Sequence, residues 1–304
     1  MVERHLAKVN VASSNLVFRS NKFLTPKVWG IFNIHSLCAI KPCFFDALAE
    51  RYRNFSATHK GVFYVKKILS YARRAIEDYN MISDGDKIAV GVSGGKDSLI
   101  LLNMFYHLKM FYPKKFEFMG ITLDLGYSES DYSPVEKMCA EKGIEYKVVK
   151  TNIKQVVFDI RNEKNPCSLC ARLRSGAINS AAKENGCNKV ALGHHNEDVI
   201  ETFFLSLFYE GRVNCFSPVT HLDRKGIYLI RPLIYTPESV IRGAAKRLNM
   251  PVCKNPCPAD GYTKRQEMKE FVNEKDRLDR HFKDRIFNAI KTSGLEGWRT
   301  EQKG

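Results

Sequence analysis

The sequence lacks several features that would assign it to common protein classes. No uncharged apolar run approaches the roughly 20 residues that a membrane-spanning helix needs, and no segment resembles a clean secretory signal peptide. Internal repeats and low-complexity tracts are also missing. Acidic residues are scarce, because 33 Asp and Glu face 48 Lys and Arg and leave a formal net charge of +15. That excess favours a polyanionic partner, nucleic acid or an anionic membrane surface, although a soluble protein that is merely basic fits equally well.

Length and composition are those of an ordinary globular protein. A chain of 304 residues with 44% hydrophobic and 27% charged residues can hold one large α/β domain, or one domain with appendages. Nine cysteines are present, and two of them, Cys167 and Cys170, form a Cys-x-x-Cys pair. Without a signal peptide, such a pair favours metal binding or catalysis over a structural disulfide, and a reducing cytoplasm is the expected location.

Strand-like and helix-like segments alternate from residue 65 onward. Apolar positions at helical spacing predict an amphipathic helix over residues 65–76, and Asp84-Gly85-Asp86 marks a turn before a buried strand. The alternation predicts an α/β fold with a parallel sheet and helices on both faces. Charged helical segments at 237–248 and 264–291 predict a helical C-terminal extension. The expected strands are 87–92, 116–123, 146–149, 189–192 and 227–230, and the expected helices between them are 99–111, 133–142, 168–184 and 201–208.

A phosphate-binding loop is predicted between the strand ending at Val92 and the helix opening at Leu99. Adjacent glycines let the backbone approach an anion, and the helix start presents free N–H groups and a positive dipole end. Serine hydroxyls and a lysine add donors and a cation. The spacing is not that of a Walker A loop, and it resembles the SGGKDS signature of PP-loop ATP pyrophosphatases, which cleave ATP between the α and β phosphates. The residues are Ser93, Gly94, Gly95, Lys96, Asp97 and Ser98.

Polar residues follow two other predicted strands, at the edge where open α/β sheets bind ligands. Asp124 ends the second strand, and Gly193-His194-His195-Asn196-Glu197-Asp198 follows the strand at 189–192. The latter stretch resembles the GHHxxD segment of the same class. Asp198 is expected to hold Mg²⁺ or to orient the adenylation site, with Glu197 as the alternative acid. Adjacent histidines rarely bind one ion together, so a structural or nucleotide-packing role is favoured for both.

The Cys-x-x-Cys pair opens the helix predicted from residue 168, a position that fits a redox pair, a zinc half-site or part of an iron–sulfur site. A zinc site needs further ligands, and Cys253-x-x-x-Cys257 is the nearest later pair. Arg172 and Arg174 follow the first pair and are expected to lower the pKa of its thiols. Three other cysteines are expected to be buried thiols: Cys139, Cys187 and Cys215.

The run from Lys87 to about Arg265 resembles the tRNA 2-thiocytidine synthetase family, the sulfur-transferring branch of the PP-loop enzymes. In that family three cysteines hold a [4Fe-4S] cluster, so the resemblance implies Cys167, Cys170 and Cys257 as ligands. Cys253 competes as the third ligand, but the prolines that flank Cys257 match the family better. The zinc-ribbon pairs of the related 2-thiouridine enzymes are missing, which favours the cytidine branch. The shared pieces are the phosphate loop, Cys167-x-x-Cys170-x-Arg172-Leu173-Arg174, Leu192-Gly193-His194-His195, Glu201-Thr202 leading to Phe208-Tyr209, and Pro256-Cys257-Pro258.

The resemblance also implies an activity. ATP with Mg²⁺ would adenylate the C2 oxygen of a tRNA cytidine, at anticodon-loop position 32 in the family, and sulfur would replace that oxygen as AMP leaves. Asp198, Arg174 and Cys257 are the expected catalytic residues, with Arg174 stabilising negative charge. The phosphate loop is expected to bind nucleotide together with Asp124, Gly193 and His194. Expected partners are tRNA, a sulfur donor such as a cysteine desulfurase, and a second copy of the chain, with no membrane.

Three regions follow from this pattern. Residues 64–235 are the expected PP-loop ATP-binding domain, and residues 236–304 are the helical region with the third cysteine. Arg242, Lys246 and the cations from Lys264 onward are expected either to track the tRNA backbone or to form a solvated helix face. Residues 1–63 hold nine Lys and Arg and three acids without periodicity. They fit a weakly ordered extension that touches tRNA, a targeting segment, or upstream sequence from a misassigned start.

Three other functions stay open at this point. A lysidine-type PP-loop ligase would join an amine to adenylated cytidine, but amine transfer needs no thiol. Sulfur transfer by a cysteine persulfide on another base, without a cluster, uses the same residues. A basic tRNA-binding or redox-sensing protein without turnover would leave the intact phosphate loop unexplained, and an ATP-pyrophosphatase assay separates it from an enzyme.

Overall fold

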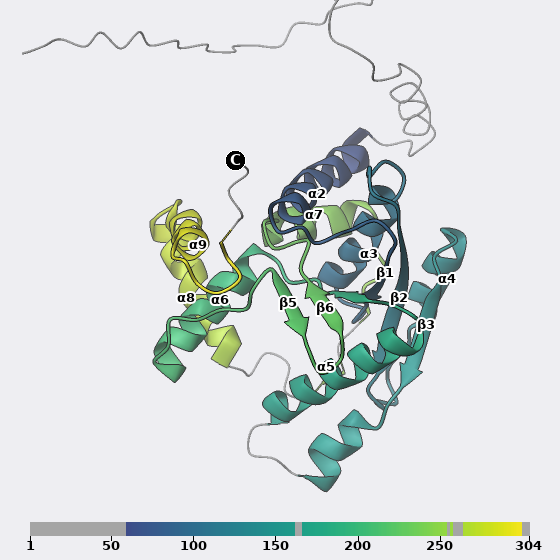
Figure 1. Ribbon diagram of the computed structural model, residues 1–304. Coiled ribbons are helices and arrows are strands. Elements are labelled where there is room, and N and C mark those ends of the chain that lie inside the picture. Colours follow the sequence, from purple (N-terminus) through teal and green to yellow (C-terminus); the bar gives the residue numbers. More distant parts are fainter. Residues whose placement is uncertain (1–58, 162–165, 254–255, 258–263, 300–304) are drawn as a thin grey trace, which may run out of the picture. The chain divides into compact units, whose positions relative to one another are not determined.

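A six-stranded sheet in the order β3-β2-β1-β4-β6-β5 forms the centre of the described fold (Figure 1). The computed structural model describes residues 59–161, 166–253, 256–257 and 264–299, all within the compact unit Leu48–Gly304. The strands are β1 Asp86–Gly91, β2 Phe116–Asp124, β3 Tyr146–Lys150, β4 Lys189–Ala191, β5 Val219–Leu222 and β6 Ile227–Ile230. All neighbours except the β5–β6 pair run parallel, as the alternation of strands and helices predicts.

The prediction of a parallel sheet is wrong at one edge. β5 pairs antiparallel with β6, so that Val219 lies opposite Ile230 and Leu222 opposite Ile227. Gly226 in the connecting turn adopts φ 63°, a left-handed conformation that glycine tolerates best. β5 has four residues of mixed exposure, and so short a segment shows no recognisable two-residue period in the sequence.

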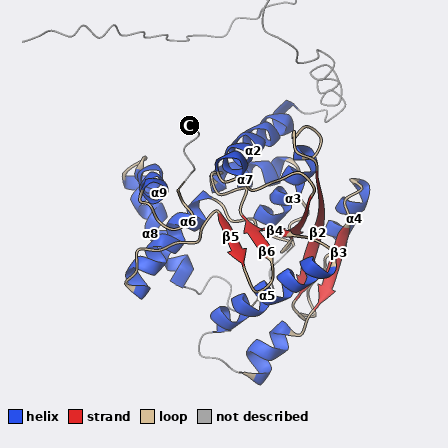
Figure 2. Cartoon of the chain, in the orientation of Figure 1, coloured by secondary structure: helices blue, strands red, loops and turns tan. Residues whose placement is uncertain are grey.

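Helices cover both faces of the sheet (Figure 2). They are α2 His59–Asp78, α3 Lys96–Leu108, α4 Ser133–Glu141, α5 Pro166–Glu184, α6 Asn196–Leu205, α7 Glu238–Arg247, α8 Lys264–Leu278 and α9 Phe282–Thr292. Ile88 and Val90 of β1 share one buried cluster with α2, α3 and α7, whereas Ala89 between them belongs to a second cluster with α5. Because alternate side chains of a strand point to opposite faces, both surfaces of β1 are buried.

Several element boundaries differ from the prediction. α2 begins at His59 rather than near residue 65, and the helix expected over 264–291 is two helices. Asp279 separates them, because its carboxylate accepts the N–H of His281 and its carbonyl accepts the N–H of Phe282. Two short π-helices, Gln155–Ile160 and Ser206–Glu210, were also not predicted.

α7 belongs to the packed core. Val240, Ile241 and Ala244 are buried in the same cluster as α2 and α3. The expected boundary at residue 236 therefore lies directly before a helix of the core. The division of the chain into three regions stays a prediction. Within the part of the chain that the structure describes, no helix is both long and apolar enough to cross a membrane. Cys38 and Cys43 lie outside the described residues.

Candidate active site

The phosphate loop and the Gly-His-His segment meet at the centre of the sheet. β1 and β4 are neighbours, and the chain proceeds outward from β1 to β2 and from β4 to β6 in opposite directions. Such a reversal of strand order is where open α/β sheets bind ligands. Gly193 after β4 packs directly on the start of α3, since a Cβ there would lie 3.1 Å from backbone atoms of Asp97 and Ser98.

The last serine of the phosphate loop, Ser98, stabilises the loop through hydrogen bonds to its backbone. The Ser98 hydroxyl donates to the carbonyl of Gly95 at 2.9 Å and accepts the N–H of Ser93 at 3.1 Å. Gly94 adopts φ 81°, which a residue with a side chain would reach only with strain. Gly95 then precedes α3, whose first backbone N–H groups are available to an anion. The loop has the composition and the helix start that phosphate binding needs.

Lys96 lies between two carboxylates. Its Nζ is 3.1 Å from Asp97 Oδ2 and 3.0 Å from Glu238 Oε1, and Lys269 Nζ contacts the same Glu238 oxygen at 3.2 Å. Burial alone would raise the pKa of Glu238, but the two lysines outweigh it and lower the pKa to about 2. Glu238 opens α7 and was not predicted as a site residue. Nothing in its sequence context distinguishes it from any acid in the first turn of a helix.

His195 is enclosed by carboxylates. Its ring nitrogens lie 3.4 Å from Glu197 Oε2, 3.5 Å from Asp198 Oδ2 and 3.9 Å from Asp97 Oδ1. Burial lowers the pKa of His195, but these carboxylates, Glu197 first, outweigh it and raise the pKa. A raised pKa favours the protonated imidazole, which has no lone pair for a metal, and the structural or nucleotide-packing role of this histidine stays a prediction.

His194 has the opposite environment. Arg231 Nε donates to its Nδ1 at 3.3 Å, and the Phe216 ring packs at 4.8 Å between centroids. Burial, together with the charge of Arg231, lowers the pKa of His194 to about 4. The pKa values of the two adjacent histidines are therefore shifted in opposite directions, and their rings have different partners.

Asp198 is oriented by two donors from different parts of the chain. Its Oδ2 accepts the backbone N–H of His195 at 2.8 Å, and its Oδ1 lies 3.3 Å from Arg265 of α8. Arg265 also approaches Glu201, whose pKa is raised to about 6 by burial and by the charge of Asp198. Both oxygens of Asp198 thus have protein partners. Among the described residues, no group of three or more His, Cys, Asp and Glu side chains is arranged to hold a single metal ion.

Asp124 lies where it was expected, at the end of β2 beside β1. Its Oδ1 accepts the N–H of Gly126 at 3.0 Å, which turns the chain after the strand. The next residue, Tyr127, hydrogen-bonds with Cys257. Tyr127 was not predicted as a site residue, since a tyrosine three positions after a strand has no distinguishing pattern.

Cys170 of the Cys-x-x-Cys pair interacts with both Cys167 and Cys257. The charges that act on the Cys170 thiol come from Arg174, Cys257 and Cys167. Arg174 lowers the pKa of Cys170, as expected, but burial raises it more, so that the pKa of this thiol is raised overall. Cysteine thiolates are the ligands of iron–sulfur clusters. Because each thiolate binds a different iron, the ligands of a cluster lie farther apart than the ligands of a single metal ion. The three side chains are therefore of the chemical type that such a cluster requires.

Cys253 lies against the phosphate loop. Its backbone N–H donates to the Gly94 carbonyl at 2.9 Å, and a Cβ on Gly94 would lie 3.3 Å from its Sγ. This hydrogen bond places Cys253, four residues before Cys257 in the sequence, beside the loop. The remaining described cysteines are buried, as expected for thiols without a role in chemistry: Cys139, Cys187 and Cys215.

Comparisons with known proteins agree with this arrangement. The PP-loop domain family matches residues 67–275. The chain is 36% identical to a tRNA-cytidine(32) 2-sulfurtransferase of Alkalilimnicola ehrlichii over 230 residues, which cover 74% of this chain and 73% of the relative. It is 36% identical to a tRNA-cytidine(32) 2-sulfurtransferase of Pseudomonas putida over 228 residues, 74% of this chain and 83% of that protein. Among solved structures, the U34-tRNA thiolase NcsA from Methanococcus maripaludis with its [4Fe-4S] cluster superposes with a TM-score of 0.63 at 25% identity, covering 77% and 80% of the two chains.

Proposed function

This chain belongs to the PP-loop family and, within it, to the tRNA-cytidine(32) 2-sulfurtransferases, and from that membership we propose that it is an ATP-dependent tRNA sulfurtransferase acting on a cytidine. The observation that carries the proposal is the meeting of two functional groups at one edge of the sheet. A phosphate loop follows β1 and binds Cys253 through the Cys253–Gly94 hydrogen bond, and Tyr127, which follows the neighbouring β2, hydrogen-bonds with Cys257. Activation by ATP and delivery of sulfur both need access to the same base.

The first step is adenylation. The phosphates of ATP would bind on Ser93–Ser98, and Lys96 would exchange its Glu238 contact for a phosphate contact. Mg²⁺, when bound with ATP, would neutralise part of the phosphate charge. The C2 oxygen of the cytidine attacks the α phosphorus, and pyrophosphate leaves. Adenylation turns that oxygen into part of a good leaving group, AMP. Asp198, oriented by Arg265 and the His195 backbone, is proposed to position the attacking base.

The second step replaces oxygen by sulfur. A sulfur nucleophile forms a bond to C2, and the bond from C2 to the adenylated oxygen breaks as AMP departs. Cys167, Cys170 and Cys257 would hold a [4Fe-4S] cluster, which when bound would supply an open iron for the incoming sulfur. Arg174, whose charge acts on Cys170, would stabilise the negative charge that develops during addition.

The target base must leave the helical stack to reach this edge. Bases in loops are the ones that can be unstacked and read, so an anticodon-loop cytidine at position 32 fits the chemistry. A cytoplasmic location, a cysteine desulfurase as sulfur source and action as a homodimer are further parts of the proposal, and they rest on the resemblance alone.

The test compares three proteins purified without oxygen: the wild type, Cys257→Ala and Cys253→Ala. The wild type should contain about four irons and four sulfides per chain and convert tRNA cytidine to 2-thiocytidine, measured by mass spectrometry of digested tRNA. Cys257→Ala should lose the iron and the product, while Cys253→Ala should keep the iron. If the wild type contained zinc or no metal and still thiolated tRNA, the cluster mechanism would be wrong and persulfide chemistry would take its place. An amine adduct on cytidine would overturn sulfur transfer altogether.

A further inference from the structure

Many cations near the C-terminus already have acidic partners. Arg265 contacts Asp198 and Glu201, and Lys269 contacts Glu238. Further pairs are Lys264–Glu267, Lys283–Asp276, Arg285–Asp279 and Lys291–Asp78. These cations stabilise the packing of α8 and α9 and neutralise site carboxylates. They are therefore poor candidates for the main contacts with a polyanion, one of the two roles that the sequence left open for them.

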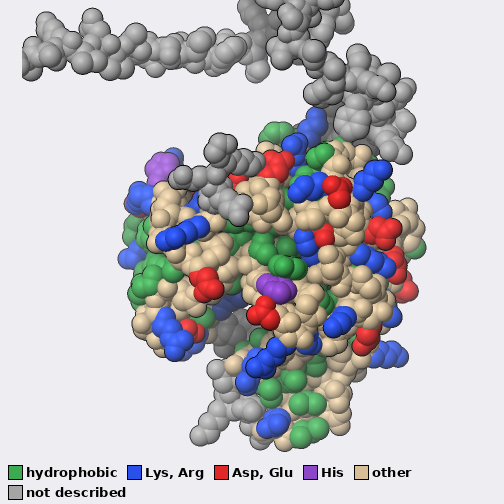
Figure 3. All heavy atoms as spheres, viewed as in Figure 1, with side chains coloured by type: hydrophobic (Ala, Val, Ile, Leu, Met, Phe, Trp, Pro, Cys, Tyr) green, Lys and Arg blue, Asp and Glu red, His purple; other side chains and the backbone are tan. Residues whose placement is uncertain are grey.

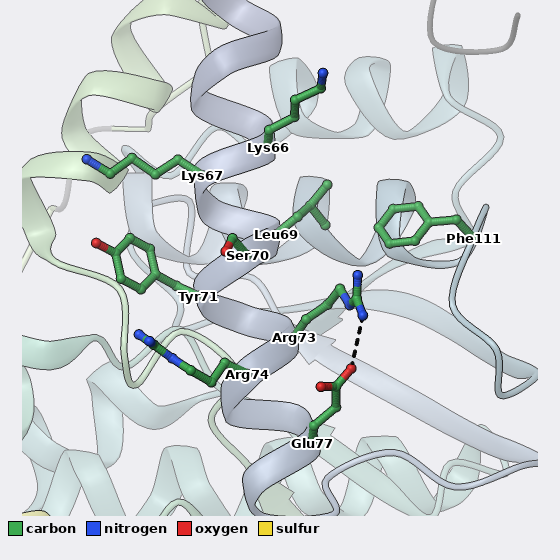
Figure 4. A pocket seen from close by; sticks show the side chains of 9 residues that line it. All are labelled: Lys66, Lys67, Leu69, Ser70, Tyr71, Arg73, Arg74, Glu77 and Phe111. Atoms are coloured by element: carbon green, nitrogen blue, oxygen red, sulfur yellow. Dashed lines mark hydrogen bonds and ion pairs between the residues drawn. The ribbon is translucent and has the colours of Figure 1, made fainter. Parts of the chain in front are cut away.

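Most of the cations that α2 presents to a surface groove have no acidic partner among the described residues. A groove of about 700 Å³ is lined by Lys66, Lys67, Arg73 and Arg74 and by a single acid, Glu77 (Figure 4). All five side chains are exposed. Arg73 pairs with Glu77 at 3.2 Å, whereas Lys66, Lys67 and Arg74 form no ion pair with any described residue. The groove thus presents an uncompensated positive charge to solvent.

The cations of α2 lead toward the active site. Lys67, Tyr71 and Arg74 follow one another at helical spacing and project from the same side of α2 (Figure 4). Tyr71 and Arg74 also line a second groove, of about 580 Å³, which includes Arg242 of α7 and reaches Glu238. Glu238 is the carboxylate that contacts Lys96. The two grooves together connect the α2 surface with the edge of the phosphate loop.

The acids of the second groove do not cancel this charge. Four acids line it: Glu197, Glu238 and Asp276 each already contact a lysine at 3.9 Å or less, and Asp284 lies 3.6 Å from His281. Arg242, by contrast, has no ion pair among the residues that the structure describes. From Lys66 to Arg74 the path runs about 12 Å along α2, at 1.5 Å per residue, which is long enough for more than one phosphate.

We infer that these connected grooves bind the phosphate backbone of tRNA and lead it to the active site. The inference rests on the proposed function, which makes tRNA the substrate. Charge complementarity favours tRNA over the chain's own N-terminal segment as the ligand of these grooves. Residues 1–58 hold eight Lys and Arg against three acids, so the positive grooves would repel them. On the face shown in Figure 3, Lys and Arg are interspersed with Asp and Glu, so the net charge of +15 alone does not mark a docking surface.

The test compares tRNA binding by full-length wild type with a groove variant, Lys67→Gln/Arg242→Gln, and with a matched control, Lys115→Gln/Lys137→Gln. The control removes the same charge from exposed lysines outside both grooves. A second variant, Lys66→Gln/Lys67→Gln, changes α2 alone. Dissociation constants are measured by fluorescence anisotropy from 50 to 300 mM salt with labelled tRNA, roughly the range over which phosphate contacts weaken most. Binding of an ATP analogue and thermal unfolding check that each variant is folded.

We expect the groove variant to bind tRNA about tenfold more weakly, and its plot of log affinity against log salt to be shallower by about 1.5 to 2. The α2 variant should behave similarly and the control like the wild type. Equal binding by all four proteins would overturn the inference and leave the proposed function intact. Failure of the wild type to bind tRNA would overturn both. Loss of binding to phosphatidylserine vesicles, with tRNA binding unchanged, would assign the grooves to a membrane and overturn the inference.

Discussion

Glu238 connects the phosphate loop to the C-terminal helices at the scale of single residues. It contacts Lys96 of the loop and Lys269 of α8, and its backbone N–H donates to Glu197 at 2.8 Å. One carboxylate therefore holds the loop lysine in place before ATP arrives. Because a phosphate must compete with this contact, the strength of the Glu238–Lys96 pair affects nucleotide affinity.

Glu238 also predicts a pH dependence of stability. Its pKa in the folded protein is about 2, below the ordinary value of 4.5, so the stabilisation is present above pH 4.5 and is lost as the pH falls toward 2. Glu238→Gln should lower the free energy of unfolding by roughly 2 kcal/mol at pH 7 and by much less near pH 3. Urea denaturation at both pH values measures this difference. Glu184→Gln, an exposed acid with no ion pair to a described residue, is the control and should show no such change. An equal loss at both pH values would contradict the pairing.

Gly193 predicts a steric effect on nucleotide binding. A methyl group there would meet the backbone of Asp97 and Ser98 at 3.1 Å, and backbone yields less easily than a side chain. Gly193→Ala should displace the start of α3 and weaken binding of an ATP analogue about tenfold, as measured by calorimetry. Gly176→Ala is the matched control, because a Cβ on that α5 glycine meets nothing within 4 Å. Wild-type affinity in the Gly193 variant would show that the loop tolerates the displacement.

Elements that are distant in the sequence share the site. α8 packs on α6 through Met268, Val272, Ile200 and Phe204, and Arg265 at its start reaches the carboxylates of α6. The helical character of both segments was predicted from their sequence, but their contact was not. Helical periodicity identifies the apolar face of each helix and leaves open which partner covers it.

The α6–α8 contact predicts a local change in stability. Arg265→Ala removes the partner of Asp198 and of the buried Glu201, so the first turns of α8 should open more often. Hydrogen exchange over residues 264–272 should become about tenfold faster, corresponding to roughly 1.4 kcal/mol. Lys264→Ala, which removes an exposed pair with Glu267, should change exchange in this region much less. Unchanged exchange in the Arg265 variant would show that apolar packing alone holds α8.

At the scale of the whole molecule, the described residues share one main buried cluster. This cluster runs from Val65 of α2 to Trp298 and includes members of α3 and α7. The PP-loop domain match begins at residue 67 and the described helix α2 at His59. The family match and the described core therefore begin within a few residues of each other.

This core predicts the result of a truncation. A chain that begins at residue 59 should unfold within about 5 °C of the full-length protein, because it keeps every described residue of the buried clusters. It should also retain adenylation and thiolation within about threefold, a change of less than 1 kcal/mol. Differential scanning calorimetry and the tRNA thiolation assay measure the two quantities. Loss of thiolation with unchanged stability would give the first 58 residues a part in tRNA binding.

The sequence by itself determined the phosphate loop, the Cys-x-x-Cys pair and the type of most elements. Each of these depends on neighbouring residues: six consecutive positions form the loop, and apolar spacing identifies helices and strands. The same reasoning missed β5 and the break between α8 and α9, because four residues or one turn carry too little periodic signal. Assignment of the third cysteine rested on the flanking prolines.

Only the tertiary structure decided which distant side chains meet at the site. Glu238, Arg265 and Tyr127 reach it because α7 packs on α3, α8 packs on α6, and Asp124 turns the chain after β2. None of these residues lies in a motif, and each acts through a partner far away in the sequence. Such contacts depend on how apolar faces are paired in three dimensions, and that pairing is a property of the folded chain rather than of any short segment.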